Sequence, residues 1–279
     1  MNIAFSPCPN DTFVFHAWVH GLIEGALVPH VTYADIDKTN NWVIASKGPE
    51  LLKISYAALP WALKDYALIP CGGALGRGCG PLVLSSNSPT SSLEGKRVAV
   101  PSERSTAYLL FRLWAAQHVP GGVGEIVNLP FHEIMPAVRD GRVDAGLVIH
   151  EARFTYPSYG LKMVTDLGNW WESETKLPIP LGAIIAHRTL DTQSVERWIR
   201  ASVEYAWANP NASKDYILRH AQEMSEEVVQ AHIQLYVNEF TANLGQEGYE
   251  AVATLLGRAA QEGLVPRIDY KDLQPKVSK

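Results

Sequence analysis

Short apolar runs of strand length alternate with longer segments of helical spacing along most of the 279-residue chain. The clearest apolar runs are residues 2–6, 97–100 and 145–149, and segments such as 105–118 and 134–140 between them have helical spacing. This alternation is typical of a parallel or mixed β-sheet covered by helices. The sequence therefore predicts an α/β fold.

A polar, proline-containing stretch, SSNSPTSS at residues 85–92, separates two such α/β units. The apolar run IPLGAIIA at 179–186 then returns the chain to the first unit. We expect two α/β lobes with a ligand cleft between them: residues 1–88 with 185–279 form lobe one, and 89–184 form lobe two. Two connections between lobes are the hinge topology of bilobal binding proteins.

The charge balance argues against nucleic acid and membrane surfaces as partners. Lys and Arg total 24 and Asp and Glu total 29, which gives a net charge of −5. A mildly acidic chain does not attract polyanions through its overall field, although local donors can still hold a small anion. The longest apolar runs are also far shorter than the roughly 18 residues of a membrane span. A small anionic substrate is therefore the expected partner, and the sequence does not indicate an oligomeric state.

The first residues, MNIAFSPCPNDT, and the cysteine content both favour a cytoplasmic location. The segment has neither the basic region nor the long apolar region of an export signal. Three cysteines, Cys8, Cys71 and Cys79, are expected to be reduced thiols. Because their spacing is not that of a zinc site, we expect no metal.

The first candidate site is the strand-to-helix junction SPCPNDT at residues 6–12, ahead of a helix expected over 13–20. Asn10 and Thr12, with the N–H groups of the helix start, are suited to hold a carboxylate. The same residues also fit an ordinary capped turn. Cys8 is either a nucleophile or a thiol buried beside the first strand, and the second interpretation is favoured.

Two further segments carry candidate groups in the first lobe. In KISY, residues 53–56, the hydroxyl of Ser55 lies where a strand runs into a helix, and a plain capped helix start explains it equally well. Residues 71–78, CGGALGRG, are expected to form a loop between strands over 66–70 and 80–85. The loop lacks a nucleotide-binding motif, so we interpret it as a hinge or cleft wall, with Arg77 as an anion contact or a solvated charge.

Two segments of the second lobe also carry candidate groups at the ends of expected strands. In PSERSTAY, residues 101–108, Ser105, Thr106 and Ala107 open a helix whose positive end suits an anion, and Ser105 also fits a helix cap. In DAGLVIHE, residues 144–151, His150 follows an apolar strand. His150 is either structural or a general base at the cleft, and Glu151 either orients it or holds the next helix start. The motifs G-x-S-x-G and H-E-x-x-H are absent from the sequence.

At these segments the chain resembles the 1,4-dihydroxy-6-naphthoate synthase family of the futalosine route to menaquinone. The resemblance rests on SPCPNDTFVFHAWVHG, KISYAA, GGALGRGCGPLV, VAVPSERSTAY, DAGLVIHEARFTYPSYGL and LPIPLGAIIA, and it is weakest past about residue 265. It implies a type II periplasmic-binding-protein-like fold used by a cytoplasmic lyase. That lyase splits cyclic dehypoxanthinyl futalosine into 1,4-dihydroxy-6-naphthoate and dihydroxyacetone.

The resemblance also implies roles for individual residues and implies no metal or organic cofactor. The histidine of the I-H-E context, here His150, acts as the general base. The substrate contacts fall in two segments of this chain, at Lys53, Ser55, Tyr56, Ser105, Thr106 and Ala107. Ser105 stands where some relatives are expected to carry threonine, and it keeps the hydroxyl.

Two alternatives remain open. The first is a solute-binding protein for a small acid, because one fold serves both roles. The second is the chorismate dehydratase of the same pathway, which shares the fold. The cleft histidine argues against the first, and the SPCPNDT and I-H-E segments argue against the second.

Overall fold

The computed structural model describes residues 1–86, 92–221 and 225–273, and it divides the chain into two compact units. Unit 1 comprises residues 1–76 and 180–279, and unit 2 comprises residues 77–179. The first boundary lies earlier than the predicted 88/89, because β5 (Leu82–Ser85) pairs with strands of unit 2. The second lies earlier than the predicted 184/185, because β10 (Ile179–His187) pairs with β3 (Leu51–Ser55) of unit 1. Residues 87–91 of the predicted polar linker lie outside the described residues.

Unit 1 is built on a five-stranded sheet with the order β2-β1-β3-β10-β4. Strand β1 is parallel to both of its neighbours, with Ile3 opposite Val31 and Leu51, whereas β10 is antiparallel to β3. These strands are β1 (Asn2–Phe5), β2 (His30–Tyr33), β3 (Leu51–Ser55), β4 (Tyr66–Gly76) and β10 (Ile179–His187). The sheet is mixed, as the sequence pattern allows.

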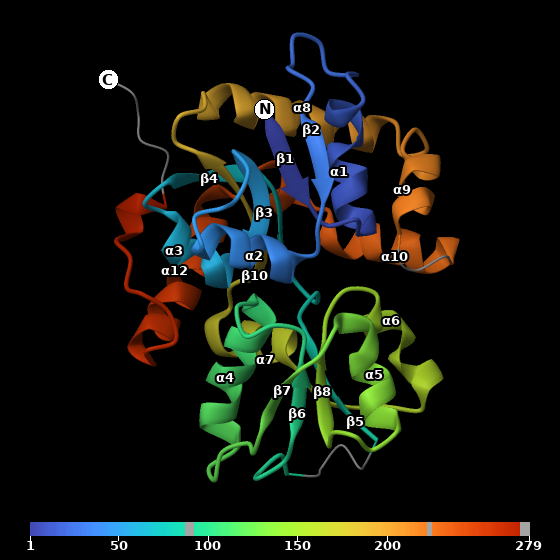
Figure 1. Ribbon diagram of the computed structural model, residues 1–279, viewed down its shortest axis with the longest axis vertical. Helices are drawn as coiled ribbons and strands as arrows, with labels where there is room; N and C mark the ends of the chain where they lie inside the picture. Colours follow the sequence, from blue (N-terminus) through green and yellow to red (C-terminus); the bar gives the residue numbers. More distant parts are fainter. Residues whose placement is uncertain (87–91, 222–224, 274–279) are drawn as a thin grey trace. The chain divides into compact units, whose positions relative to one another are not determined.

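Helix α1 (Pro9–Val19) lies at the centre of the unit 1 core. Ten of its eleven residues are buried because α8, α9 and α10 pack against it, so the helix has no solvent-facing stripe. Figure 1 shows α8 and α9 beside α1. The other helical segments of unit 1 are α2 (Ile36–Ile44), η1 (Tyr56–Ala58), α3 (Leu59–Ala62), α8 (Thr192–Ala208), α9 (Lys214–His220), α10 (Glu226–Tyr236), α11 (Glu239–Ala242), α12 (Gly245–Gln261) and η3 (Tyr270–Asp272).

The glycine-rich segment after Pro70 is strand and not the predicted loop. Strand β4 continues through Gly76 because its glycines permit close packing. A Cβ on Gly72, whose φ is +77°, would lie 2.8 Å from a methyl of Ile199, and one on Gly73 would lie 2.7 Å from the carbonyl oxygen of Gly182. Here glycine allows a β4–β10 approach that other residues would prevent.

Unit 2 is built on a second five-stranded sheet with the order β7-β6-β8-β5-β9. Strand β6 is parallel to β7 and β8, and β5 runs antiparallel between β8 and β9. Figure 1 shows α4 and α7 on one side of this sheet and α5 on the other. The remaining elements are β6 (Val98–Val100), α4 (Thr106–His118), β7 (Ile126–Asn128), α5 (Phe131–Arg139), β8 (Ala145–Val148), α6 (Ala152–Thr155), η2 (Tyr156–Tyr159), β9 (Lys162–Asp166) and α7 (Leu167–Thr175).

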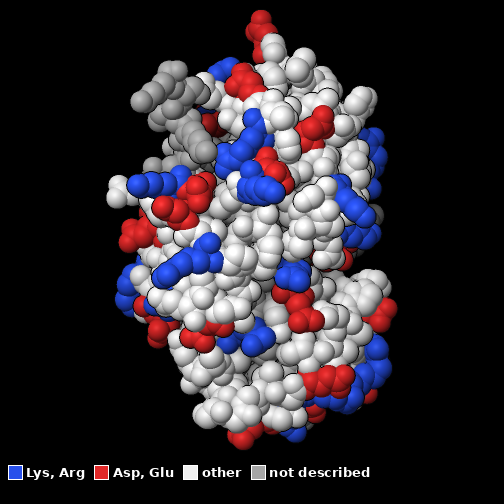
Figure 2. Space-filling view, turned by 60° about the vertical axis from the view of Figure 1, so that its left-hand side comes forward, with Lys and Arg blue, Asp and Glu red and all other residues white. Residues whose placement is uncertain are grey.

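The surface carries charges of both signs. Figure 2 shows Lys and Arg side chains interspersed with Asp and Glu over the visible face. Among the helices in the described part of the chain, none is both long and apolar enough to cross a membrane.

An aromatic and histidine cluster joins α9 to α1 and β2. The Tyr33 ring stacks on His220 with 4.2 Å between centroids, and its hydroxyl lies 2.8 Å from that of Tyr216. The His16 ring lies 5.5 Å from Tyr216 and 4.6 Å from His20. Burial lowers the pKa of both His16 and His220. Nearby charges lower it further: that of His20 for His16, and those of Arg219 and His20 for His220.

We expect these two histidines to make the protein less stable as the pH falls. Their pKa values in the folded protein lie below the ordinary 6.5, so these residues take up protons at a higher pH in the unfolded chain than in the folded protein. The free energy of unfolding should therefore be highest above pH 6.5 and fall as the pH drops below it. Urea unfolding between pH 8 and pH 5 measures this, and His220→Asn should reduce the slope. A slope unchanged by that substitution would contradict the assignment.

Candidate functional site

A buried ion pair lies where β1 and β3 end in unit 1. The Asp11 carboxylate, in the first turn of α1, pairs with the Lys53 ammonium on β3. Asp11 is 2% exposed and Lys53 is 5% exposed, so neither charge is solvated by bulk water. In the described part of the chain Lys53 Nζ has no second hydrogen-bond acceptor. An ammonium group has three donors, so two remain for an anion.

The ion pair continues into a chain of buried polar groups. Asn10 Nδ2 donates to Asp11 Oδ1 at 2.8 Å, and Asn10 Oδ1 lies 3.1 Å from His232 Nε2 on α10. Because the amide oxygen only accepts, the imidazole nitrogen must donate. Residues from α1, β3 and α10 thus form one network, His232–Asn10–Asp11–Lys53.

Gly182 on β10 leaves the space that the Lys53 side chain occupies. Gly182 pairs with Ser55 in the β3–β10 register, and a Cβ there would lie 2.9 Å from Lys53 Cε. A side chain at this position would displace the ammonium from Asp11. The lysine is therefore placed by a glycine far away in the sequence.

Ser55 and Tyr56 follow directly on the same strand end. Asn40 on α2 holds Ser55 twice: its Nδ2 donates to Ser55 Oγ at 3.0 Å, and its Oδ1 accepts from the Ser55 N–H at 2.8 Å. Ser55 is thus fixed by a side chain of another helix. Burial, and to a smaller extent Tyr249, raises the pKa of the Tyr56 phenol, so that group stays protonated and can donate.

The expected cap at residues 10–12 is wrong in detail. Helix α1 begins at Pro9 with Cys8 as the N-cap residue, because proline at the first helical position needs no N–H partner. Thr12 Oγ1 donates to the carbonyl oxygens of Cys8 at 3.0 Å and Pro9 at 3.2 Å. The Thr12 hydroxyl proton is used inside the helix, whereas Asn10 belongs to the polar network.

Ser105 caps helix α4 of unit 2, as expected. Its Oγ accepts from the N–H of Tyr108 at 3.1 Å and donates to the carbonyl oxygen of Ser102 at 2.8 Å. Thr106 and Ala107 form the first helical turn, where N–H groups have no acceptor within the helix. This helix start has the donor arrangement of an anion site.

His150 follows the end of β8 in an unusual backbone conformation. Its φ of 53° lies in the left-handed region, which is uncommon for a residue other than glycine and costs roughly 1–3 kcal/mol. The Phe131 ring meets the imidazole edge-on, with 5.6 Å between centroids. Strain of this kind persists only where the surrounding structure holds it.

Arg153 holds the segment that carries His150. The backbone N–H of Arg153 donates to the His150 carbonyl oxygen at 3.3 Å. Its guanidinium donates to the Gly80 carbonyl oxygen at 2.7 Å and to Asp166 Oδ2 at 2.5 Å. The loop after β8 is therefore tied both to Gly80, two residues before β5, and to the end of β9.

We expect Arg153→Met to lower the free energy of unfolding by about 3 kcal/mol. This is the lower end of the range for a broken buried ion pair, because the Asp166 carboxylate keeps hydrogen bonds from two backbone N–H groups. Arg77→Met is the matched control. Its ion pair with Glu172 spans 3.8 Å and the arginine side chain is 45% exposed, so its loss should cost less than about 1 kcal/mol. Urea unfolding measures both, and equal losses would contradict the bracing role.

The remaining candidates of the sequence analysis have simpler surroundings. The three cysteines are buried and form no disulfide among the described residues, and burial raises the pKa of Cys71 and of Cys79 to about 12. Arg77 donates to the Lys176 carbonyl oxygen at 3.0 Å in addition to its ion pair with Glu172. Glu151 Oε2 is buried and has no hydrogen-bond partner among the described residues.

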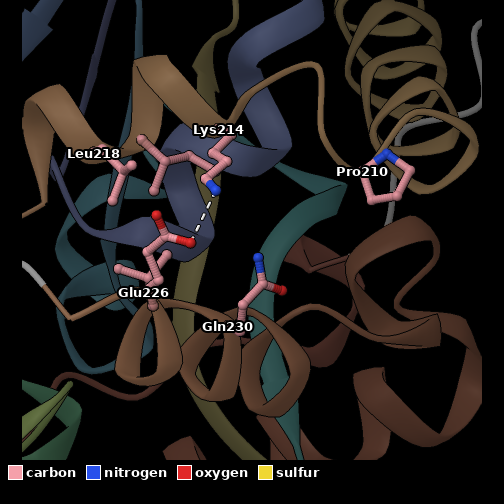
Figure 3. Close-up of a pocket in the computed structure, with 7 residues that line it drawn as sticks. Pro210, Lys214, Leu218, Glu226 and Gln230 are labelled. Atoms are coloured by element: carbon pink, nitrogen blue, oxygen red, sulfur yellow. Dashed lines mark ion pairs between the residues drawn. The ribbon is translucent and has the colours of Figure 1, made fainter.

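Two surface hollows of unit 1 are lined by residues that do not belong to the polar network. Figure 3 shows the smaller one, between α9 and α10, where Lys214 Nζ and Glu226 Oε2 pair at 2.8 Å. The larger hollow is lined by residues of β4 and by residues around the start of α8, among them Ile69, Arg188 and Glu196. Neither contains a predicted site residue.

Local sequence patterns do not reveal three residues of this candidate site, namely Asp11, Asn40 and His232. Asn40 and His232 sit within ordinary helical patterns, and no local motif signals that they reach Ser55 and Asn10. Asp11 lies in the segment SPCPNDT, but its partner Lys53 is 42 residues away in the sequence. Hydrogen bonds between distant elements leave no trace in local spacing.

Comparisons with known proteins agree with this architecture. Residues 1–261 match the protein family described as "Menaquinone biosynthesis". A relative from Streptomyces coelicolor named "1,4-dihydroxy-6-naphtoate synthase" is 62% identical, and the alignment covers 96% of this chain and 95% of the relative. A Thermus thermophilus relative of the same name is 46% identical over 95% of each chain.

Solved structures show the fold. A crystal structure of an Archaeoglobus fulgidus protein has a TM-score of 0.87 at 33% identity and covers 95% of this chain and 98% of its own. The periplasmic aliphatic sulphonate binding protein of Escherichia coli has a TM-score of 0.69 at 14% identity, covering 100% of this chain and 93% of its own. The predicted periplasmic-binding-protein-like α/β fold is confirmed, and the chain belongs to the menaquinone biosynthesis family.

Proposed function

We propose that this protein is a 1,4-dihydroxy-6-naphthoate synthase, a carbon–carbon lyase. It splits cyclic dehypoxanthinyl futalosine into 1,4-dihydroxy-6-naphthoate and dihydroxyacetone, and it works in the cytoplasm on this small anionic substrate. Support comes from the family match over residues 1–261 and from the name shared by both curated relatives, each aligned over nearly the full chain.

The observation that carries a catalytic role is the placement of His150. An imidazole lies two residues after the end of the buried strand β8, at a φ of 53°, on a segment braced by Arg153. Backbone strain clusters at functional sites, and histidine is the most frequent general acid or base in enzymes. His150 is therefore the general base of the proposed reaction.

The proposed reaction is a retro-aldol type cleavage. His150 takes the proton of a substrate hydroxyl, and the oxygen forms a carbonyl as the adjacent carbon–carbon bond breaks. The electron pair stays on the ring fragment, which becomes aromatic as the three-carbon fragment leaves, and the proton held by His150 returns to the ring fragment. Because aromatisation supplies part of the driving force, one positioned base and well-held substrate groups suffice.

Lys53 binds the substrate carboxylate in this proposal. Its buried ammonium has two donors without an acceptor among the described residues, and these are suited to a charge-assisted hydrogen bond with a carboxylate. Ser55, Tyr56 and Asn10 belong to the same strand-end region. The start of α4, with Ser105, Thr106 and Ala107, holds further oxygens of the substrate.

Incubating the purified protein with cyclic dehypoxanthinyl futalosine tests the proposal. We expect 1,4-dihydroxy-6-naphthoate and dihydroxyacetone in equal amounts, measured by chromatography with mass detection. A parallel incubation with chorismate should leave that compound unchanged. Dehydration of chorismate would instead indicate the dehydratase, and tight substrate binding without any product would indicate a solute-binding protein.

A further inference from the structure

We propose that His232 is a positioning residue for substrate binding. Through Asn10 and Asp11 it fixes the Lys53 ammonium in the orientation that receives the substrate carboxylate. This inference rests on the proposed function, in which Lys53 binds that carboxylate. His232 is 1% exposed on α10, and the network reaches Lys53 on β3 through two residues of α1.

The first step is the choice of one amide orientation at Asn10. His232 Nε2 donates to Asn10 Oδ1 at 3.1 Å. Rotating the amide by 180° would set its oxygen against the Asp11 carboxylate, which has no proton to donate, and its NH₂ group against the Nε2–H that now donates, so both hydrogen bonds of the amide would be lost. His232 therefore holds the Asn10 NH₂ group toward Asp11, at 2.8 Å from Oδ1.

The second step is the restraint of the Asp11 carboxylate. Its Oδ1 accepts from Asn10 Nδ2 and also pairs with the Lys53 ammonium. Every member of the network is at most 6% exposed, so bulk water cannot replace a lost donor. When the Asn10 amide turns, the carboxylate loses a donor and takes Lys53 entirely for itself. The ammonium then turns away from the substrate.

Three substitutions test the inference. His232→Leu removes the donor, and His232→Gln places an amide NH₂ where Nε2 was. Ser202→Ala is the matched control, because Ser202 is fully buried in the same unit and its hydroxyl donates to the Val14 carbonyl oxygen at 2.6 Å, away from Lys53. For each variant, calorimetry gives the substrate dissociation constant, a product assay gives kcat, and thermal unfolding gives the midpoint.

We expect His232→Leu to weaken substrate binding about 10-fold, which is the size of one lost buried hydrogen bond. The kcat of this variant should stay within about 2-fold of the wild-type value. His232→Gln should restore affinity, and Ser202→Ala should lower the unfolding midpoint without changing affinity. Unchanged affinity in His232→Leu, or equal weakening in Ser202→Ala, would overturn the positioning role. A wild-type protein that neither binds nor converts the substrate would overturn the proposed function itself, and with it the ligand assigned to Lys53.

Discussion

Replacing His150 with asparagine should lower kcat by about 10²- to 10⁴-fold while the substrate dissociation constant stays near its wild-type value. The imidazole supplies a base in the transition state, and this contribution is absent when substrate merely binds. Asparagine is the substitution of choice because it tolerates the left-handed backbone that His150 adopts at a φ of 53°. Its amide cannot take the hydroxyl proton. Single-turnover product formation and calorimetry measure the two quantities separately.

His132→Asn is the matched control for this experiment. His132 is also in unit 2, but its side chain is 78% exposed and its Nε2 lies 4.0 Å from Glu133 Oε1. Its removal should change neither kcat nor affinity. Turnover of the His150 variant near that of the control would exclude His150 as the base. A loss of binding in the His150 variant equal to its loss of kcat would assign the residue to binding instead.

The sequence predicts well those features that depend on neighbouring residues. The helix start at Ser105 follows from a hydroxyl ahead of an apolar helix, and the structure places the cap there. Helix α4, Thr106–His118, also ends where the expected helical segment 105–118 ends. Both signals lie within a few residues of the element they define, so one local pattern suffices.

Features that depend on distant partners are harder to predict. Glycine usually marks a turn, so the segment CGGALG suggested a loop, but in the fold Gly72 and Gly73 make room for Ile199 and Gly182. The Asn10–His232 hydrogen bond joins residues 222 positions apart. In both cases the deciding contact exists only after the sheet and its covering helices have assembled.

Lys53→Met should have the second large effect, on both stability and binding. It leaves the Asp11 carboxylate buried without its counter-ion, which costs about 3–5 kcal/mol of unfolding free energy. It also removes the charged donors for the substrate carboxylate, so affinity should fall about 10- to 100-fold, the value of a hydrogen bond to a charged group. Urea unfolding and calorimetry measure the two effects.

The double variant Asp11→Asn/Lys53→Met separates the two roles of the lysine. It removes both charges together, and the asparagine oxygen still accepts from Asn10 Nδ2, so no buried charge is left uncompensated. Most of the lost stability should therefore return. Affinity should stay as low as in Lys53→Met, because the ammonium is absent from both. If affinity returned together with stability, the lysine would only stabilise the fold, and the substrate carboxylate would have to bind elsewhere, with the start of α4 as the next candidate.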